Sequence, residues 1–140
     1  MAFKLANLEL EIAENSTWKI YMLCVNGKNE VEEYLNKLKK KRPNEHGALM
    51  GAFEKFLKHG PSSSNEKFKC EGDGIFVLKA HQQRVYGFYG GENPNDRNCF
   101  ITCVCDEKKQ DKADPKVLDK ARDLKKEYEK ERKTKNEKKR

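Results

Sequence analysis

Four side chains near the middle of the chain have the types and spacing suited to holding a phosphodiester. Lys79 ends one apolar run, Arg84 opens the next, and Tyr86 follows two positions later. His81 lies in the short polar segment between the two runs. A guanidinium binds phosphate bidentately, and an imidazole exchanges protons near neutral pH. The pattern predicts a cationic surface with a proton-transfer group beside it.

Each of these residues also has a purely structural interpretation. Arg84 suits either a phosphate or a solvated strand position that contacts another protein. Lys79 suits either proton transfer, if it is buried, or an edge strand protected from aggregation. His81 suits acid–base chemistry or simple exposure, and Tyr86 suits base stacking or a core position. Three positions separate Tyr86 from Tyr89, so the two should face opposite sides of a strand.

A second group of cations follows the third apolar run, which spans residues 99–105. It consists of Lys108, Lys109 and Lys112. These lysines would contact flanking phosphates, or they would form a solvated turn.

The five cysteines are odd in number and have no C-x-x-C spacing, which is typical of free thiols in a reducing cytoplasm. Cys99, Cys103 and Cys105 alternate along one run, so strand geometry predicts them on one face. A line of three thiols without a fourth ligand does not favour zinc. We therefore expect small buried side chains and no metal or cofactor. The sequence shows no signal peptide and no apolar run that would span a membrane.

Charge is concentrated at the C-terminal end. The net charge is +7, and residues 120–140 carry 11 Lys/Arg against 5 Asp/Glu. The remaining chain is nearly balanced, with 19 against 18. With 36% hydrophobic and 38% charged residues, the core must be small. The charge fits an RNA or an acidic partner.

The periodicity predicts an α+β fold with a twisted, mainly antiparallel sheet. Strands are expected near 8–12 and 18–25, and again at 74–79, 84–89 and 99–105. Asn29 has the spacing to cap a first helix through Glu32, and Pro43 ends that helix. A second helix is expected from Glu45 to His59, with Gly60 as its stop. The two helices should lie together on one side of the sheet.

A last helix should begin at Pro115 after an Asp114 cap. It should pack through Leu118, Ala121 and Leu124, and its apolar stripe ends near Tyr128. We expect one domain over residues 1–133 and a disordered basic tail over 134–140.

Six segments in this order resemble HigB-like toxins of the RelE/ParE toxin–antitoxin superfamily. The resemblance covers roughly residues 17–130. The matching segments are Trp18–Tyr21, Gly27–Leu35, Leu57–Pro61, Asp73–Lys79, Arg84–Tyr86, and the double lysine Lys108-Lys109 followed by Lys112 and Pro115.

The resemblance implies a RelE-like fold and a toxin that cleaves mRNA on the ribosome without a metal. It implies a cognate antitoxin that covers the cationic side of the sheet or displaces the last helix. Within this interpretation Arg84, Lys79, Tyr86 and His81 are the catalytic candidates, and the lysines at 108, 109 and 112 bind RNA. Arg84, Lys79 and Lys108 or Lys109 would line one concave face.

The chain departs from the family pattern at several positions. Val77 replaces a glutamate, Lys79 an arginine, and Gln83 and Gly87 aromatic residues, while Asp106 and Glu107 replace apolar ones. These changes leave two alternatives open. One is a ParE-type toxin that binds a protein such as DNA gyrase, and the other is a fold-sharing binding protein without catalytic activity.

Overall fold

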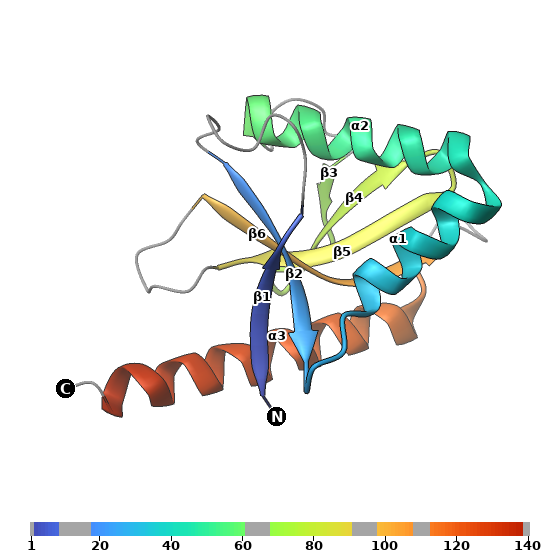
Figure 1. Ribbon diagram of the computed structural model, residues 1–140. Helices are drawn as coiled ribbons and strands as arrows, with labels where there is room; N and C mark the ends of the chain where they lie inside the picture. The colour runs from blue at the N-terminus through green and yellow to red at the C-terminus, as the bar shows by residue number, and fades with distance from the viewer. Residues whose placement is uncertain (1, 9–17, 61–67, 91–97, 108–112, 139–140) are drawn as a thin grey trace.

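Two helices cover one face of a six-stranded sheet and a third helix crosses the other face (Figure 1). The computed structural model describes residues 2–8, 18–60, 68–90, 98–107 and 113–138. The elements in chain order are β1 (Phe3–Asn7), β2 (Lys19–Val25), α1 (Glu30–Lys41), α2 (Pro43–His59), β3 (Phe68–Cys70), β4 (Phe76–Ala80), β5 (Gln83–Tyr89), β6 (Cys99–Glu107) and α3 (Pro115–Lys138). The α+β class predicted from the sequence is confirmed.

The strand order is β1-β2-β6-β5-β4-β3, and only the β2–β6 pair is parallel. The mainly antiparallel sheet is thus confirmed. The first strand lies earlier than expected, at Phe3–Asn7, and most of the predicted segment 8–12 falls outside the described residues. The short edge strand β3 was not predicted, because two of its three residues are exposed and polar alternation over three positions is a weak signal.

The start of α1 follows the predicted capping box. The Glu32 backbone N–H donates to Asn29 Oδ1 at 3.0 Å, and Asn29 Nδ2 donates to the Glu32 carboxylate at 3.4 Å. One stripe of the helix is buried, through Val31, Leu35 and Leu38. The second helix begins at Pro43, two residues before the predicted start, because proline is favoured at a first helical position.

Each face of the sheet has its own core. Under α1 and α2 the core is rich in aromatic rings, among them Phe53, Phe56 and Phe100. Under α3 the sheet contributes Val77, Phe88 and Ile101, and the helix contributes Ala121 and Tyr128. Ala121 is fully buried, with Leu118 and Leu124 packed beside it, so the predicted contact face of this helix is confirmed.

The last helix is longer than its apolar stripe. The sequence predicted disorder from Thr134 onward, whereas the backbone is helical as far as Lys138. Lysine and glutamate are good helix formers, and no Gly or Pro interrupts this stretch, so the helical backbone continues beyond Tyr128. None of the described helices combines the length and apolarity required to span a membrane.

A bulge in β6 changes which residues share a face. Tyr86 pairs with Val104 and Gly87 pairs with Thr102, which leaves Cys103 as an extra residue. Cys103 consequently packs in the α3 core, while Cys105 packs against the core under α1 and α2. The prediction that Cys99, Cys103 and Cys105 share one face is therefore wrong. Within the described part of the chain, no three potential metal ligands come together.

The bulge also explains why residue 87 is glycine. A methyl group at Gly87 would overlap the carbonyl oxygen of Ile101 and approach the Phe100 ring at 2.9 Å. The backbones of β5 and β6 therefore meet directly at this position. No larger side chain fits at this position without moving β6.

We expect Gly87→Ala to destabilise the protein by about 1–3 kcal/mol, the usual cost of overpacking. Gly51→Ala is a matched control, because Gly51 is in α2 with open space around its Cα. It should instead stabilise by roughly 0.5–1 kcal/mol through helix propensity. Urea denaturation of both variants tests the difference, and equal stabilities would contradict the proposed backbone contact.

Candidate functional site

The predicted site residues meet at one end of the sheet, around the β4–β5 turn. Lys79 is directly opposite Arg84, and Arg84 is directly opposite Asp106 on β6. We call these three residues the charged row. They share the face of Val77 and Tyr86, which is the face covered by α3. The structure thus brings Lys79, Arg84 and Tyr86 together on one face, as the sequence predicted.

Burial separates the members of this group. Arg84 is only 3% exposed and Tyr86 is 0% exposed, whereas Lys79 is partly exposed. A buried guanidinium needs a nearby carboxylate, and Asp106 occupies the adjacent position across the strand. Most of the Arg84 surface is therefore covered by protein. Of the two cations in the charged row, Lys79 is the one that solvent reaches.

Tyr86 is held in its neutral form. Burial raises the pKa of its phenol above the ordinary value, and the neighbouring Arg84 guanidinium opposes that change. A neutral phenol donates a proton or a hydrogen bond but is not a base. Tyr89 lies on the opposite face, as strand parity predicted, and burial raises its pKa to about 12.

His81 is exposed in the two-residue turn between β4 and β5. Its φ of 53° is left-handed, a conformation uncommon for residues other than glycine. The turn places the imidazole at the same end of the sheet as Lys79. The lysines at 108, 109 and 112 lie outside the described residues, so their predicted contribution to a concave face stays a prediction.

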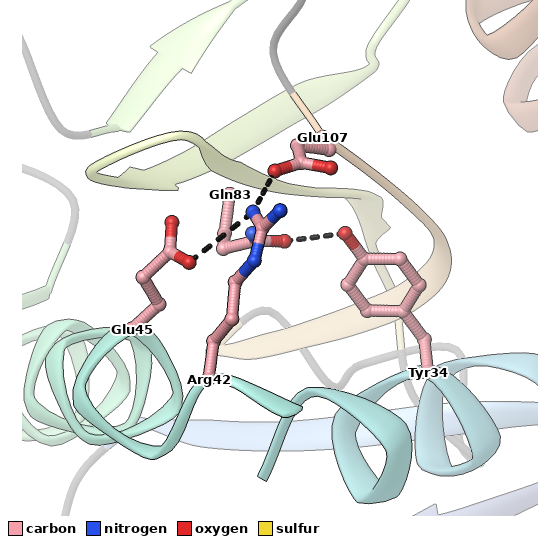
Figure 2. Close-up of polar contacts among 5 residues, drawn as sticks. All are labelled: Tyr34, Arg42, Glu45, Gln83 and Glu107. Atoms are coloured by element: carbon pink, nitrogen blue, oxygen red, sulfur yellow. Dashed lines mark hydrogen bonds and ion pairs between the residues drawn. The ribbon is translucent and has the colours of Figure 1, made fainter. Parts of the chain in front are cut away.

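A second polar group, which the sequence did not reveal, lies on the other face at this end (Figure 2). The Tyr34 hydroxyl donates to the Gln83 side-chain oxygen, and Gln83 is 1% exposed. Arg42 forms ion pairs with Glu107 and, at 3.3 Å, with Glu45. These contacts join the corner between α1 and α2 to the first residue of β5 and the last residue of β6.

Long sequence separation explains why these contacts were missed. Tyr34 and Gln83 are 49 positions apart, and Arg42 and Glu107 are 65 apart. The only local signal was Gln83 itself, a polar residue at the start of an otherwise largely apolar strand. In this chain Gln83 is buried like an aromatic residue, and its amide oxygen is satisfied by Tyr34.

The chemistry available at this end follows from which groups reach solvent. Lys79 supplies an accessible cation, and His81 supplies an accessible acid or base. Arg84 and Tyr86 lie in the buried layer behind these two groups, next to Asp106. From there they contribute to the electric field at the exposed groups and to their positions. Side chains of these types are chemically suited to binding an anion at the edge of the sheet and to transferring a proton beside it.

Comparison of the sequence with models of known protein families gave no match, and comparison with curated proteins gave none either.

The buried position of Tyr34 makes stability depend on pH. Burial, followed by electrostatic interactions with Cys105, Glu107 and Asp106, raises the pKa of Tyr34 from 10.0 to about 12. The folded protein thus holds this proton more tightly than the unfolded chain. The contribution of neutral Tyr34 to the free energy of unfolding is fully present below pH 10 and is lost as the pH rises toward 12.

We expect Tyr34→Phe to cost about 1–3 kcal/mol at neutral pH, because it leaves the buried Gln83 oxygen without a donor. Tyr89→Phe is the matched control, since it also removes a phenol with a pKa of about 12. Tyr89→Phe should lower the free energy of unfolding at neutral pH by less than Tyr34→Phe does. Urea denaturation from pH 7 to 11 measures both effects, and an equal loss in the two variants would contradict the role of Tyr34.

Proposed function

We propose that this protein is the toxin of a type II toxin–antitoxin system, a metal-independent endoribonuclease that cleaves mRNA on the ribosome in the cytoplasm. The main support is the pairing of Lys79 with Arg84 across β4 and β5, with His81 in the turn that joins them. The resemblance of six ordered segments to HigB-like toxins of RelE-like fold supports the same interpretation.

In the proposed reaction a base removes the proton of the ribose 2′-hydroxyl. The 2′-oxygen then attacks phosphorus, and the bond to the 5′-oxygen breaks as an acid protonates that leaving oxygen. His81 is the accessible group for one of these proton transfers. Lys79 stabilises the additional negative charge on the phosphorane.

Arg84 and Tyr86 have supporting roles in this proposal. Because Arg84 is 3% exposed, its charge acts on the phosphate through the protein rather than through an open bidentate contact. Asp106 lies opposite Arg84 on β6, where its carboxylate would hold that guanidinium in place. Tyr86 remains a neutral hydrogen-bond donor next to it.

A cognate antitoxin is part of the same proposal. It would neutralise the toxin by covering the charged end of the sheet or by displacing α3, which lies over that face (Figure 1). The surplus of positive charge after Asp114 would accelerate association with an acidic antitoxin.

One observation favours a second candidate, a binding protein of this fold that does not cleave RNA. The burial of Arg84 and Tyr86 matches a structural role for both residues. In that case the protein would act on a protein target such as DNA gyrase, or it would only bind its partner.

Mapping of mRNA 5′ ends after induced expression separates the two candidates. We expect cleavage by the wild type, a loss of about 10²-fold in Lys79→Ala, and a loss of roughly 10²–10⁴-fold in His81→Asn. Arg84→Ala requires a parallel stability measurement, because its side chain is buried. Growth arrest without any mRNA cleavage would overturn the ribonuclease proposal and favour the protein target.

Lys55→Ala and His59→Asn are the controls, because both residues are exposed on α2, on the other face of the sheet. Both variants should cleave as the wild type does. Wild-type cleavage by a Lys79→Ala/His81→Asn double variant would rule out this site even if the protein proves to be a ribonuclease.

A further inference from the structure

Three lysines of α1 form an exposed cationic surface that lies outside the charged row and the β4–β5 turn. Lys37, Lys40 and Lys41 are spaced at i, i+3 and i+4, which places them on one side of the helix. All three are exposed. We call them the α1 lysine face.

No ion pair of these three lysines is found among the described residues. Arg42, Lys120 and Arg122 each pair with a carboxylate. Of the acidic groups on or near α1, Glu30 binds Lys120 at 2.6 Å and Glu45 binds Arg42, while Glu33, four residues before Lys37, is exposed. The α1 lysine face thus carries three cations beside one exposed carboxylate.

Helix stability does not account for all of this charge. Cations in a last turn are favoured by the helix dipole, which accounts for Lys40 and Lys41. Lys37 lies one turn earlier, where Glu33 at i−4 offsets part of its charge, and like charges spaced at i, i+3 and i+4 repel one another. An external anion would reduce the remaining repulsion.

The composition of the exposed side of α1 indicates which kind of anion fits. Its exposed positions are Glu32, Glu33, Asn36 and lysines, with no apolar residue among them. Protein interfaces usually bury an apolar centre, whereas a phosphate backbone requires only cations at suitable spacing. The surface therefore favours a nucleic acid over an acidic protein.

The α1 lysine face lies at the same end of the molecule as the charged row. Arg42, which follows Lys41 directly, pairs with Glu107 at the end of β6, and Asp106 of the charged row is the preceding residue (Figure 2). A strand of RNA bound along α1 would thus run toward the β4–β5 turn.

We infer that Lys37, Lys40 and Lys41 bind the phosphate backbone of single-stranded RNA without reading its sequence. The choice of RNA as the polyanion rests on the proposed function. The position and exposure of the three lysines do not depend on it. The surface would hold RNA at the end of the sheet that carries Lys79 and His81.

Binding of fluorescent oligouridylate, followed by anisotropy over a range of salt concentrations, tests the inference. The whole chain is used, with Lys79→Ala included in every variant so that cleavage does not interfere. Replacing the three lysines of the face by Gln should weaken binding roughly 10- to 100-fold. It should also reduce the slope of log affinity against log salt by about 0.7 for each phosphate that the protein no longer neutralises.

The matched control removes three exposed lysines from α3 on the opposite face of the sheet, at Lys116, Lys126 and Lys133. That variant should bind RNA nearly as the parent does. Replacing the α1 lysines by Arg should restore binding, since it keeps the charge, and circular dichroism confirms that each variant is folded.

Equal weakening by the α1 and α3 triple variants would overturn the inference, because it would indicate a nonspecific charge effect. Unchanged binding in the α1 variant would do the same. A loss of polyglutamate binding with RNA binding retained would instead indicate an acidic protein partner. If wild-type protein fails to cleave mRNA but binds RNA through α1, the proposed function fails and this inference stands.

Discussion

The close approach of β5 and β6 at Gly87 is the constraint on which the rest of the structure depends. These two strands form the centre of the sheet, and their contact admits no side chain at residue 87. The bulge at this point inserts Cys103 and so fixes which face each later residue of β6 occupies. Asp106 reaches the face of Arg84 only because of this extra residue. The charged row is therefore a consequence of the backbone geometry several residues away.

The end of the sheet combines buried and exposed polar groups in a consistent way. Gln83 lies beside Tyr34 on one face, and Arg84 lies opposite Asp106 on the other. The hydrogen bond between Tyr34 and Gln83 favours one geometry on its side of the sheet. Lys79 and His81 remain at the surface of this rigid frame. A scaffold that orders its buried charges and leaves a few groups accessible is suited to orienting a flexible ligand.

Much of the fold could be predicted from the sequence because its signals are local. Asn29, Glu32, Pro43 and Gly60 mark helix ends through contacts within a few residues, and these boundaries agree with the structure to within two positions. The bulge could not be predicted, since alternation along a single strand does not reveal an extra residue.

The candidate site shows the same division between local and distant information. Strand parity alone placed Lys79, Arg84 and Tyr86 on one face. It could not show that Arg84 would be buried, because burial depends on how distant elements pack around the sheet. Gln83 and Glu107 contact Tyr34 and Arg42, which precede them by 49 and 65 positions. A short sequence motif cannot predict contacts between residues so far apart.

The parallel pairing of β2 with β6 has a consequence for how the chain folds. It covers only Lys19–Met22 against Cys99–Thr102, and the Thr102 hydroxyl donates to the Tyr21 carbonyl across 81 positions. The sheet cannot close until this distant segment is available, and contacts of such long range slow folding. During synthesis β2 can therefore pair with β6 only after residue 102 has emerged, although α2 can already pack against β4. The two parts of the sheet would be joined late, after most of their own strands and helices are available.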